Sequence, residues 1–316
     1  MKVKLFILLC FLFVLGNQAV VAQERTVEPE VGEPAVLRLA AENKFSYQSH
    51  LRLYSPLLRN VYTFTQQAVK DRESVYITDT MALEAGMDGS VYYDWNKNQR
   101  DSLAAVRFTE PVNRKITVSV DENALQSRLE AQKQVYDVLD AGRGQSYRIY
   151  KKRDKEEIIT IDNGPLEGFD TKTYFQLTEN IPPQAWTMSG DTSTVLNYLC
   201  QKASVTFRGR TYVAWFTLDI PINDGPWKFY GLPGLILKVQ DLENKFCFLA
   251  IGLQKAGGES ITMPTDRKRV SCNLKELSDF KKNERRYISV GFVENGGVTY
   301  YRTKNPVTYF SLERGD

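Results

Sequence analysis

Two aspartates close together in the chain, Asp219 and Asp224, are the first candidates for chemistry. They lie five positions apart across Pro221, so their carboxylates could converge on a cation or flank a bond that is hydrolysed. The competing interpretation is structural, with Asp219 ending a strand and Asp224 beginning an Asn-Asp-Gly turn. The turn is the preferred interpretation, and a hydrolase that uses both carboxylates is kept as an alternative.

Other catalytic or metal-binding arrangements have few suitable residues. His50 is the only histidine, and no nucleophile signature lies beside it. Beyond residue 22 the cysteines are Cys200, Cys247 and Cys272, which are spaced too widely for a closed zinc site. Two of them could form a disulfide in an oxidising compartment, or all three could stay free, and the sequence does not select a pair. We therefore predict no catalytic residue, metal ligand or cofactor.

The segment 207–238, FRGRTYVAWFTLDIPINDGPWKFYGLPGLILK, combines aromatic, aliphatic and cationic side chains in a short space. Its apolar side chains could line a ligand site while its charged ones hold a polar end of the ligand. The candidate ligand-binding residues are therefore Arg208, Arg210, Trp215, Asp224, Trp227, Lys228, Phe229 and Leu232. For each of them, packing in the core is an equally weighted alternative.

Glycines and prolines punctuate the same segment and predict tight turns. Gly209 between two arginines suits a positive φ angle, and Gly231 allows a close approach of neighbouring groups. Pro233 and Gly234 fit the two central positions of a type II turn, in which the glycine takes a positive φ. The expected structural turn residues are Gly209, Gly225, Pro226, Gly231, Pro233 and Gly234.

Short runs rich in Tyr, Val, Ile, Thr and Phe predict many strands around this segment. Most connections between the runs are too short for a crossover helix, which favours antiparallel neighbours. Helical patterns occupy 46–60, 121–144 and 273–283. The fold class is therefore mainly β with a few helices (α+β). The strands are expected at 61–69, 74–86, 90–95, 146–152, 157–162, 172–178, 195–207, 211–219, 235–241 and 245–254.

The first 22 residues have the pattern of a signal peptide. Lys2 and Lys4 precede an apolar run of about 11 residues, which is shorter than the roughly 20 that span a bilayer, and small residues end at Ala22. We expect export, no transmembrane segment in the mature chain, a partly helical arm at 23–59 and a single domain at 60–316. Because residues 1–22 hold two lysines and no acids, their removal lowers the formal charge from +3 to +1. Nucleic acid is therefore not an expected partner.

The hexapeptide GLPGLI at 231–236 follows FRGR, AWF, IPI and GPWKF, and this combination resembles the GLPGLI family of secreted proteins from Bacteroidota. The resemblance covers about 60–255 and includes YLCQKA (198–203), Trp186, IYK (149–151) and MALEAGMDGSVYYD (81–94). It implies a periplasmic or outer-membrane-facing protein with no established activity. By analogy, the succession of strands with a small helical cap is similar to the strongly curved sheet, or open half-barrel, of periplasmic lipoprotein carriers.

From these observations the sequence predicts a non-enzymatic periplasmic binding protein of the cell envelope. On its curved sheet it would hold an apolar small molecule or lipid, or a segment of an outer-membrane or other envelope protein. Two alternatives stay open, namely the hydrolase described above and a structural component of an outer-membrane-associated assembly.

Overall fold

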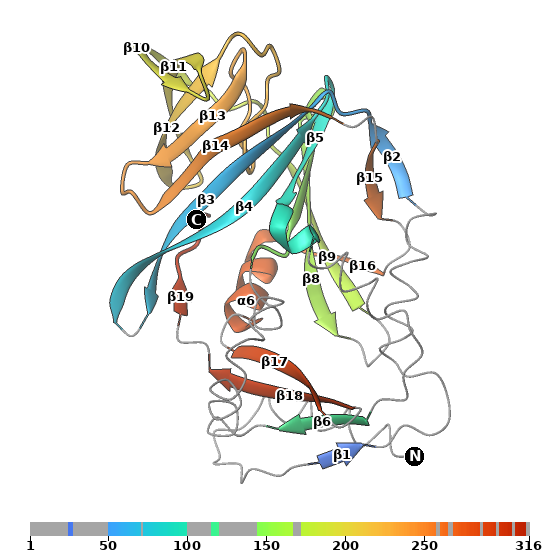
Figure 1. The fold of residues 1–316 in the computed structure, drawn as a ribbon. Coiled ribbons are helices and arrows are strands. Elements are labelled where there is room, and N and C mark those ends of the chain that lie inside the picture. The colour runs from blue at the N-terminus through green and yellow to red at the C-terminus, as the bar shows by residue number, and fades with distance from the viewer. Residues whose placement is uncertain are drawn as a thin grey trace.

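A computed structural model describes the chain at residues 25–27, 50–70, 72–99, 115–119, 144–166, 172–256, 260–264, 268–284, 287–294, 297–304 and 307–313. One large sheet of 13 strands dominates these residues (Figure 1). Its strand order is β10-β11-β12-β13-β14-β3-β4-β5-β7-β8-β9-β16, and β19 pairs separately with β3. All neighbouring pairs in it are antiparallel except β16 with β9.

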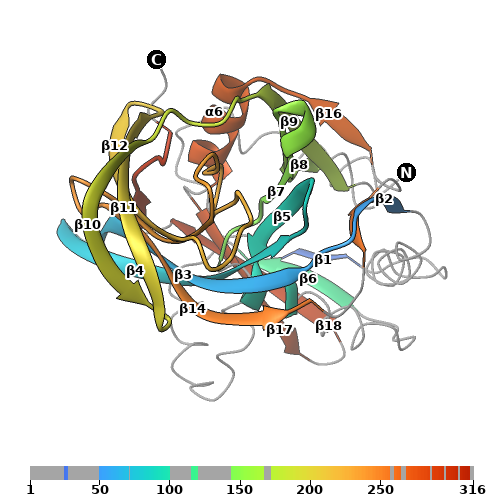
Figure 2. The same cartoon turned by 90° about the horizontal axis from the view of Figure 1, so that it is seen from above.

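The bounds of these strands follow the runs of β-branched and aromatic residues closely. In chain order they are β3 Leu58–Lys70, β4 Glu73–Ala85, β5 Gly89–Asp94, β7 Arg148–Lys152, β8 Glu157–Leu166, β9 Lys172–Asn180, β10 Thr187–Val195, β11 Tyr198–Phe207, β12 Arg210–Thr217, β13 Leu235–Asp241, β14 Phe246–Lys255, β16 Arg269–Ser271 and β19 Val307–Tyr309. The sheet is strongly curved and remains open, because its two ends at β10 and β16 do not pair with each other (Figure 2). The predicted mainly β fold with an open, curved antiparallel sheet is confirmed.

Alternation along the central strands separates an inner face from an outer face. In β3 every second side chain from Leu58 to Ala68 is buried, including Tyr62, Phe64 and Gln66, while those between are half-buried. Side chains of a strand point alternately to opposite faces, so the buried row marks the concave side of the sheet. Phe64 stacks on Phe248 of β14 at 4.6 Å between ring centroids, which extends this inner row onto the neighbouring strand.

Part of the concave side is filled by the connection 218–234 between β12 and β13, which lies inside the curve of the sheet (Figure 2). Phe229 is the centre of this filling. Its ring contacts those of Tyr212, Trp227, Phe207, Trp186 and Phe248, with centroid separations of 4.8, 5.2, 5.9, 6.0 and 6.2 Å. Mostly edge-to-face and tilted contacts of this kind add to the stabilisation from buried area.

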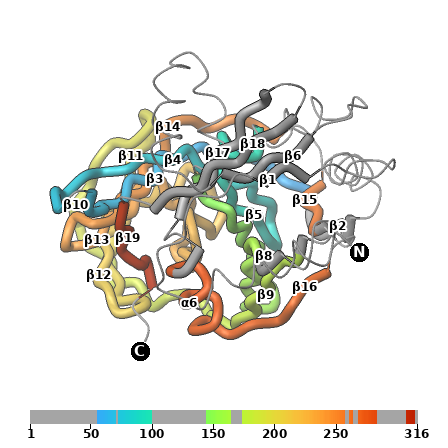
Figure 3. The backbone as a smooth tube through the Cα atoms, turned by 90° about the horizontal axis from the view of Figure 1, so that it is seen from below, coloured from blue at the N-terminus to red at the C-terminus, as the bar shows by residue number. Residues whose placement is uncertain are grey.

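Two further elements lie against the open side of the curve. The helix α6 (Leu274–Glu284) begins with a capping box, in which Asn273 and Glu276 exchange side-chain to backbone hydrogen bonds of 2.9 and 2.8 Å. β19 pairs with the far end of β3, beyond the point where β14 stops. In Figure 3 the red β19 lies inside the curve of the strands, and the orange α6 lies at the opening between β12 and β9.

The remaining strands form two smaller sheets. β15 (Ile261–Pro264) pairs with β2 (His50–Tyr54), and Ile261 and Met263 pack with Val91, Tyr150 and their neighbours in a second core cluster. A four-stranded sheet has the order β1-β6-β18-β17, from Arg25–Val27, Lys115–Ser119, Gly297–Lys304 and Tyr287–Glu294.

The helix predicted at 273–283 is confirmed as α6. The helix predicted at 46–60 is wrong where the structure describes that segment, because His50–Tyr54 forms β2 and the chain enters β3 at Leu58. As strands, these residues form backbone hydrogen bonds with β15, β4 and β14. A short helix would have only its own internal hydrogen bonds, which are marginally stable without tertiary packing. The helix expected at 121–144 and the signal peptide at 1–22 lie outside the described residues.

Candidate functional site: a pocket on the concave face

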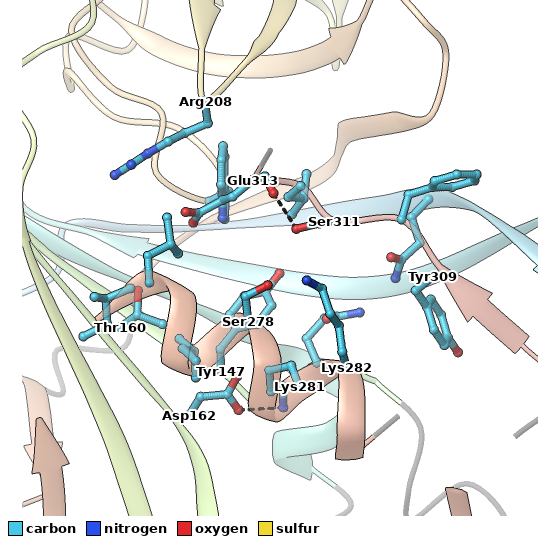
Figure 4. Close-up of a pocket in the computed structure, with 18 of the residues that line it drawn as sticks. Tyr147, Thr160, Asp162, Arg208, Ser278, Lys281, Lys282, Tyr309, Ser311 and Glu313 are labelled. Atoms are coloured by element: carbon cyan, nitrogen blue, oxygen red, sulfur yellow. Dashed lines mark hydrogen bonds and ion pairs between the residues drawn. The ribbon is translucent and has the colours of Figure 1, made fainter. Parts of the chain in front are cut away.

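The concave side of the sheet is not wholly filled by its own side chains. Between β3, β7, β8 and β9 on one side and α6 with the C-terminal segment on the other lies a pocket of about 1180 Å³ (Figure 4). Its lining combines apolar side chains, such as Phe64, Ile149, Leu177, Trp227 and Leu277, with several charged ones. This volume is sufficient for a ligand of several hundred daltons or for a short chain segment.

Two polar groups in the sheet wall stand out. Gln66 and Thr160 are both buried, and within the described part of the chain neither Gln66 Nε2 nor Thr160 Oγ1 has a hydrogen-bond partner. Both residues line the pocket. A buried polar group without a partner costs free energy, so these two atoms are available to hydrogen-bond a polar group of a bound molecule.

Lys228 lines the pocket and joins two elements that are distant in the sequence. Lys228 is 1% exposed, and its ammonium pairs with the carboxylates of Glu179 on β9 and Glu313 near the C-terminus. Arg208, in the turn between β11 and β12, also pairs with Glu179. A lysine this deeply buried needs such partners, because desolvation of an unpaired charge is very costly.

A turn with unusual backbone geometry delivers Lys228 to this position. Phe229 N–H donates to the carbonyl of Pro226 at 3.1 Å, and Trp227 between them has φ 51°. A bulky residue seldom adopts a positive φ, and such a conformation persists only where its surroundings enforce it. Here the Trp227 ring packs edge-to-face on Phe207 at 5.6 Å. The turn therefore places Trp227 and Lys228 together on the pocket wall.

At the lower end, α6 is fastened to the sheet by one lysine. Lys281 Nζ donates to Ser146 Oγ at 2.7 Å and to the buried Asp162 carboxylate at 3.1 Å, and Ser146 itself donates to Asp162 at 2.6 Å (Figure 4). Phe280 adds an edge-to-face contact with Phe175 of β9 at 5.0 Å. These contacts hold the helix against β8 and β9 beside the pocket.

A buried ion cluster fixes the connection 218–234 to β7 and to the short turn that follows it. Asp224 is buried between the ammonium of Lys151 on β7, at 2.6 Å, and the guanidinium of Arg153. Lys151 also donates to the carbonyls of Gly225 and Phe229 at 2.5 and 3.2 Å, so all three of its protons have acceptors. Burial lowers the pKa of Lys151, and the adjacent Asp224 carboxylate opposes that shift.

The candidate ligand-binding residues from the sequence occupy different environments. Arg208, Arg210, Trp227 and Lys228 line the pocket. Asp224, Phe229 and Leu232 are buried in the ion cluster and the core, and they are not among the lining residues. Trp215 alternates with the buried Ala214 and Phe216 and stands half-buried on the outer face, 5.9 Å below the Lys202 ammonium.

The pair of aspartates does not form a shared site in the structure. Asp219 is exposed at the end of β12, whereas Asp224 is buried with two cations. Neither carboxylate lines the pocket. The arrangement gives no support to a hydrolase that uses both carboxylates, and the turn in this connection runs from Pro226 to Phe229 rather than from Asp224.

The GLPG turn differs from its prediction in one respect. Gly234 does not have the positive φ of a type II turn. Its requirement is space, because a Cβ on Gly234 would lie 1.9 Å from the Thr217 carbonyl oxygen. A Cβ on Gly225 would likewise lie 2.9 Å from side-chain atoms of Ile236. Pro226 lies buried between Gly225 and Trp227, and Pro233 is exposed.

The other two glycines carry the positive φ angles. Gly209 has φ 69° in the expected tight turn. Gly231 has φ 108°, with Gln184 backbone atoms 3.0 Å from where its Cβ would be. The backbone of Gln184 thus approaches Gly231 closely.

Several site residues were missed by sequence reasoning. Glu179, Glu313, Asp162 and Lys281 are single charged residues in runs that are typical of solvated surface, and only the fold brings them together. Lys151 had a signal, because it is the last residue of the IYK tripeptide singled out in the sequence.

The three cysteines that follow residue 22 are free thiols. β11, which holds Cys200, and β14, which holds Cys247, are separated by β12 and β13, and the register places Cys247 level with Ser204 rather than with Cys200. The three strand spacings between β11 and β14 alone amount to about 14 Å. That separation exceeds the roughly 7 Å limit for a disulfide.

Comparison with known proteins finds one family-model match, which lies on the densest sequence segment. A family model described as "Protein of unknown function (Porph_ging)" matches residues 204–238. The match covers β12, the connection 218–234 and the start of β13. No curated protein matches the chain.

Among solved structures, one titled "Structure of PNGF-II in P21 space group" aligns with a TM-score of 0.44 and 13% identity over 75% of this chain. The aligned part is 35% of that protein, so the chain spans about a third of its length. A putative outer membrane lipoprotein-sorting protein domain from Vibrio parahaemolyticus aligns over 71% of this chain and 93% of its own, at 10% identity and a TM-score of 0.21. Likenesses at these TM-scores do not bear on function.

Two further findings concern the described residues. None of their helices is both long and apolar enough to cross a membrane. In the same ranges, no group of three or more His, Cys, Asp or Glu side chains could hold a metal ion.

Proposed function

We propose that this chain is a non-enzymatic binding protein of the cell envelope, and that its concave pocket holds an apolar ligand or an apolar segment of an envelope protein. The observation that carries the proposal is the pocket of about 1180 Å³ beside the connection 218–234. Its apolar wall is formed by Phe64, Ile149, Leu177 and Leu277. Removal of a ligand's apolar surface from water would supply the driving force.

The polar groups of the pocket support binding rather than catalysis. Lys228 and Lys281 are both occupied by carboxylates of the chain itself. Gln66 Nε2 and Thr160 Oγ1 are placed to orient a ligand through one or two hydrogen bonds within an apolar wall. A few polar groups in a mostly apolar cavity are typical of ligand-binding sites.

The signal-peptide pattern of residues 1–22 supports a place in the envelope, with the mature protein acting in the periplasm or at the outer membrane. In that compartment a protected concave surface would carry an apolar molecule through water. A purely structural role in an envelope assembly would not need such a pocket.

A neutral apolar reporter, N-phenyl-1-naphthylamine, tests the pocket by its fluorescence increase on binding. Ser278 of α6 lines the pocket, so Ser278→Trp should fill it and weaken reporter binding at least tenfold. Ser204, half-buried on β11 and outside the pocket lining, provides the matched change Ser204→Trp, which should leave binding unaltered. Equal binding by Ser278→Trp and the parent would show that the reporter does not use this pocket.

The natural ligand class can be sought directly. The protein purified from its native envelope, extracted and analysed by mass spectrometry, should carry a bound amphiphile or a cross-linked envelope protein. Recovery of neither, together with absent reporter binding, would remove the proposal.

A further inference from the structure

The C-terminal segment 307–313 forms one wall of the pocket, and its residues 307–309 are extended as β19. β19 pairs with β3 at three positions, from Val307 with Lys70 to Tyr309 with Ala68. β14 leaves β3 at the pair Phe246 with Gln66, so the segment takes the strand position that β14 gives up. Beyond Tyr309 the chain continues along the pocket wall through Ser311 to Glu313 (Figure 4).

Three buried donors hold three successive residues of this segment. Arg210 Nη2 donates to the Ser311 carbonyl at 3.0 Å, and the Tyr212 hydroxyl to the Leu312 carbonyl at 3.5 Å. Lys228 then pairs with the carboxylate of Glu313. Two of the donors contact main-chain oxygens, which any polypeptide offers in register, and an acyl chain has no such series of carbonyls. This pattern is typical of a groove that binds extended peptides.

Side-chain contacts add a preference for certain residue types. Phe310 and Leu312 are half-buried against the main core cluster, and the Lys245 ammonium lies 4.9 Å from the Phe310 ring. Within the described residues, the buried Glu313 Oε2 has no hydrogen-bond partner, so Lys228 is the cation that holds this carboxylate through its other oxygen. The groove therefore suits a segment with an aromatic residue, then an aliphatic residue two positions on, then an acid.

The side chains of residues 307–313 are less buried than the side chains of the groove that contact them. Thr308 and Ser311 are exposed and the other side chains of 307–313 are half-buried, whereas Arg210, Tyr212 and Lys228 are buried. Segments with few buried contacts open locally at a small fraction of the global unfolding free energy. Opening would leave Lys228 paired with Glu179 and Arg210 near Asp241 at 3.6 Å, so the groove would keep its charges compensated.

We propose that this groove binds an extended, acid-bearing segment of a partner protein, and that residues 307–313 occupy it in the partner's absence. The inference rests on the proposed function and names one class of occupant for it. The partner segment would add a short strand beside β3 and replace Glu313 on Lys228.

Binding of a fluorescent peptide to the full-length chain tests the inference. The peptide NPVTYFSLERGD reproduces residues 305–316. Against the parent protein it should bind weakly, because the chain's own segment competes at a high effective concentration. The double variant Phe310→Ala, Leu312→Ala weakens that competitor, and fluorescence anisotropy should show at least tenfold tighter binding of the peptide.

Changes in the peptide provide controls that leave the protein untouched. Replacement of its glutamate by glutamine should weaken binding to the double variant about tenfold, and a scrambled peptide should not bind. On the protein side, Lys228→Met should abolish the preference for glutamate over glutamine. If Lys228→Met fails to fold, the peptide series alone still decides.

Other outcomes would overturn the inference. Equal binding of the peptide and its scrambled form, or no binding to the double variant, would exclude a peptide groove. Uptake of a fluorescent fatty acid without any peptide binding would assign the site to lipids. Dimerisation of the parent that the double variant loses would assign the groove to a second copy of the chain. The proposed function is tested separately through Ser278, so either proposal can fail alone.

Discussion

The ammonium of Lys151 and the carboxylate of Asp224 lie 2.6 Å apart with exposed fractions of 1% and 0%. Lys151 belongs to β7 and Asp224 to the connection between β12 and β13, so the pair joins segments more than 70 residues apart. Arg153 extends the cluster to the carbonyls of Gly86 and Met87 before β5. The connection that carries Trp227 and Lys228 to the pocket is therefore anchored by charge as well as by aromatic packing.

Asp224→Asn should lower the free energy of unfolding by about 3–5 kcal/mol, because it leaves Lys151 buried without its counter-charge. Urea unfolding followed by circular dichroism measures the change. Asp191→Asn is the matched control, because Asp191 pairs with Lys202 at 2.8 Å on the exposed strand β10. It should leave the urea midpoint in place, and equal losses in the two variants would contradict a structural role for Asp224.

Gly234→Ala should destabilise the protein by about 1–3 kcal/mol through overpacking, since the new Cβ would lie 1.9 Å from the Thr217 carbonyl oxygen. In β10, no atom lies within 4 Å of the position that a Cβ on Gly190 would take, so Gly190→Ala should be close to neutral. Thermal unfolding of both variants checks the difference. A Gly234→Ala protein that melts with the parent would mean that Thr217 and Gly234 can separate at little cost.

Lys281→Met should loosen α6, because the buried Asp162 loses the ammonium that pairs with it and the helix loses its link to β8. The expected cost is about 1–3 kcal/mol, concentrated in the helix. Hydrogen exchange followed by mass spectrometry should show faster exchange in 274–284 than in the parent, with β3 unchanged. Lys282→Met is the control, because Lys282 is exposed and its ion pair with Asp279 of the same helix is long at 3.6 Å. Equal exchange in both variants would contradict this anchoring.

The thiol of Cys272 should react slowly at neutral pH, because burial, aided by Glu276 and Asp162, raises its pKa to about 11. In the unfolded chain the thiol pKa is about 8.5. The folded state thus binds the proton more tightly, so this contribution to stability is complete below about pH 8.5 and is lost as the pH rises towards 11. Alkylation by iodoacetamide should reach half its maximal rate near pH 11 in the native protein.

Glu276→Gln provides the control for that titration. It keeps a capping side chain at the start of α6 but removes a negative charge near Cys272, so the alkylation midpoint should move to lower pH. A native midpoint at the unfolded value would show that Cys272 is open to solvent.

Local sequence signals were sufficient for most strands and for α6. A run of β-branched and aromatic residues from Val61 to Thr65 indicates β3, and Asn273 with Glu276 indicates the start of α6, so each element was readable from its own residues. The helix prediction for His50–Tyr54 was wrong because a short run with two leucines fits either period, and its pairing with β15 lies more than 200 residues away in the chain.

The sequence by itself determined the β-rich class, the tight turn at Gly209 and the importance of the segment 207–238, because alternation and turn chemistry act between near neighbours. Only the tertiary structure decided which charged residues meet. Lys228 finds Glu179 and Glu313 at separations of 49 and 85 residues, and Asp224 finds Lys151 in the same way. A buried charge needs a partner of opposite charge, but the residues next to it in the sequence do not indicate which distant residue that is. The curved sheet brings the two partners together.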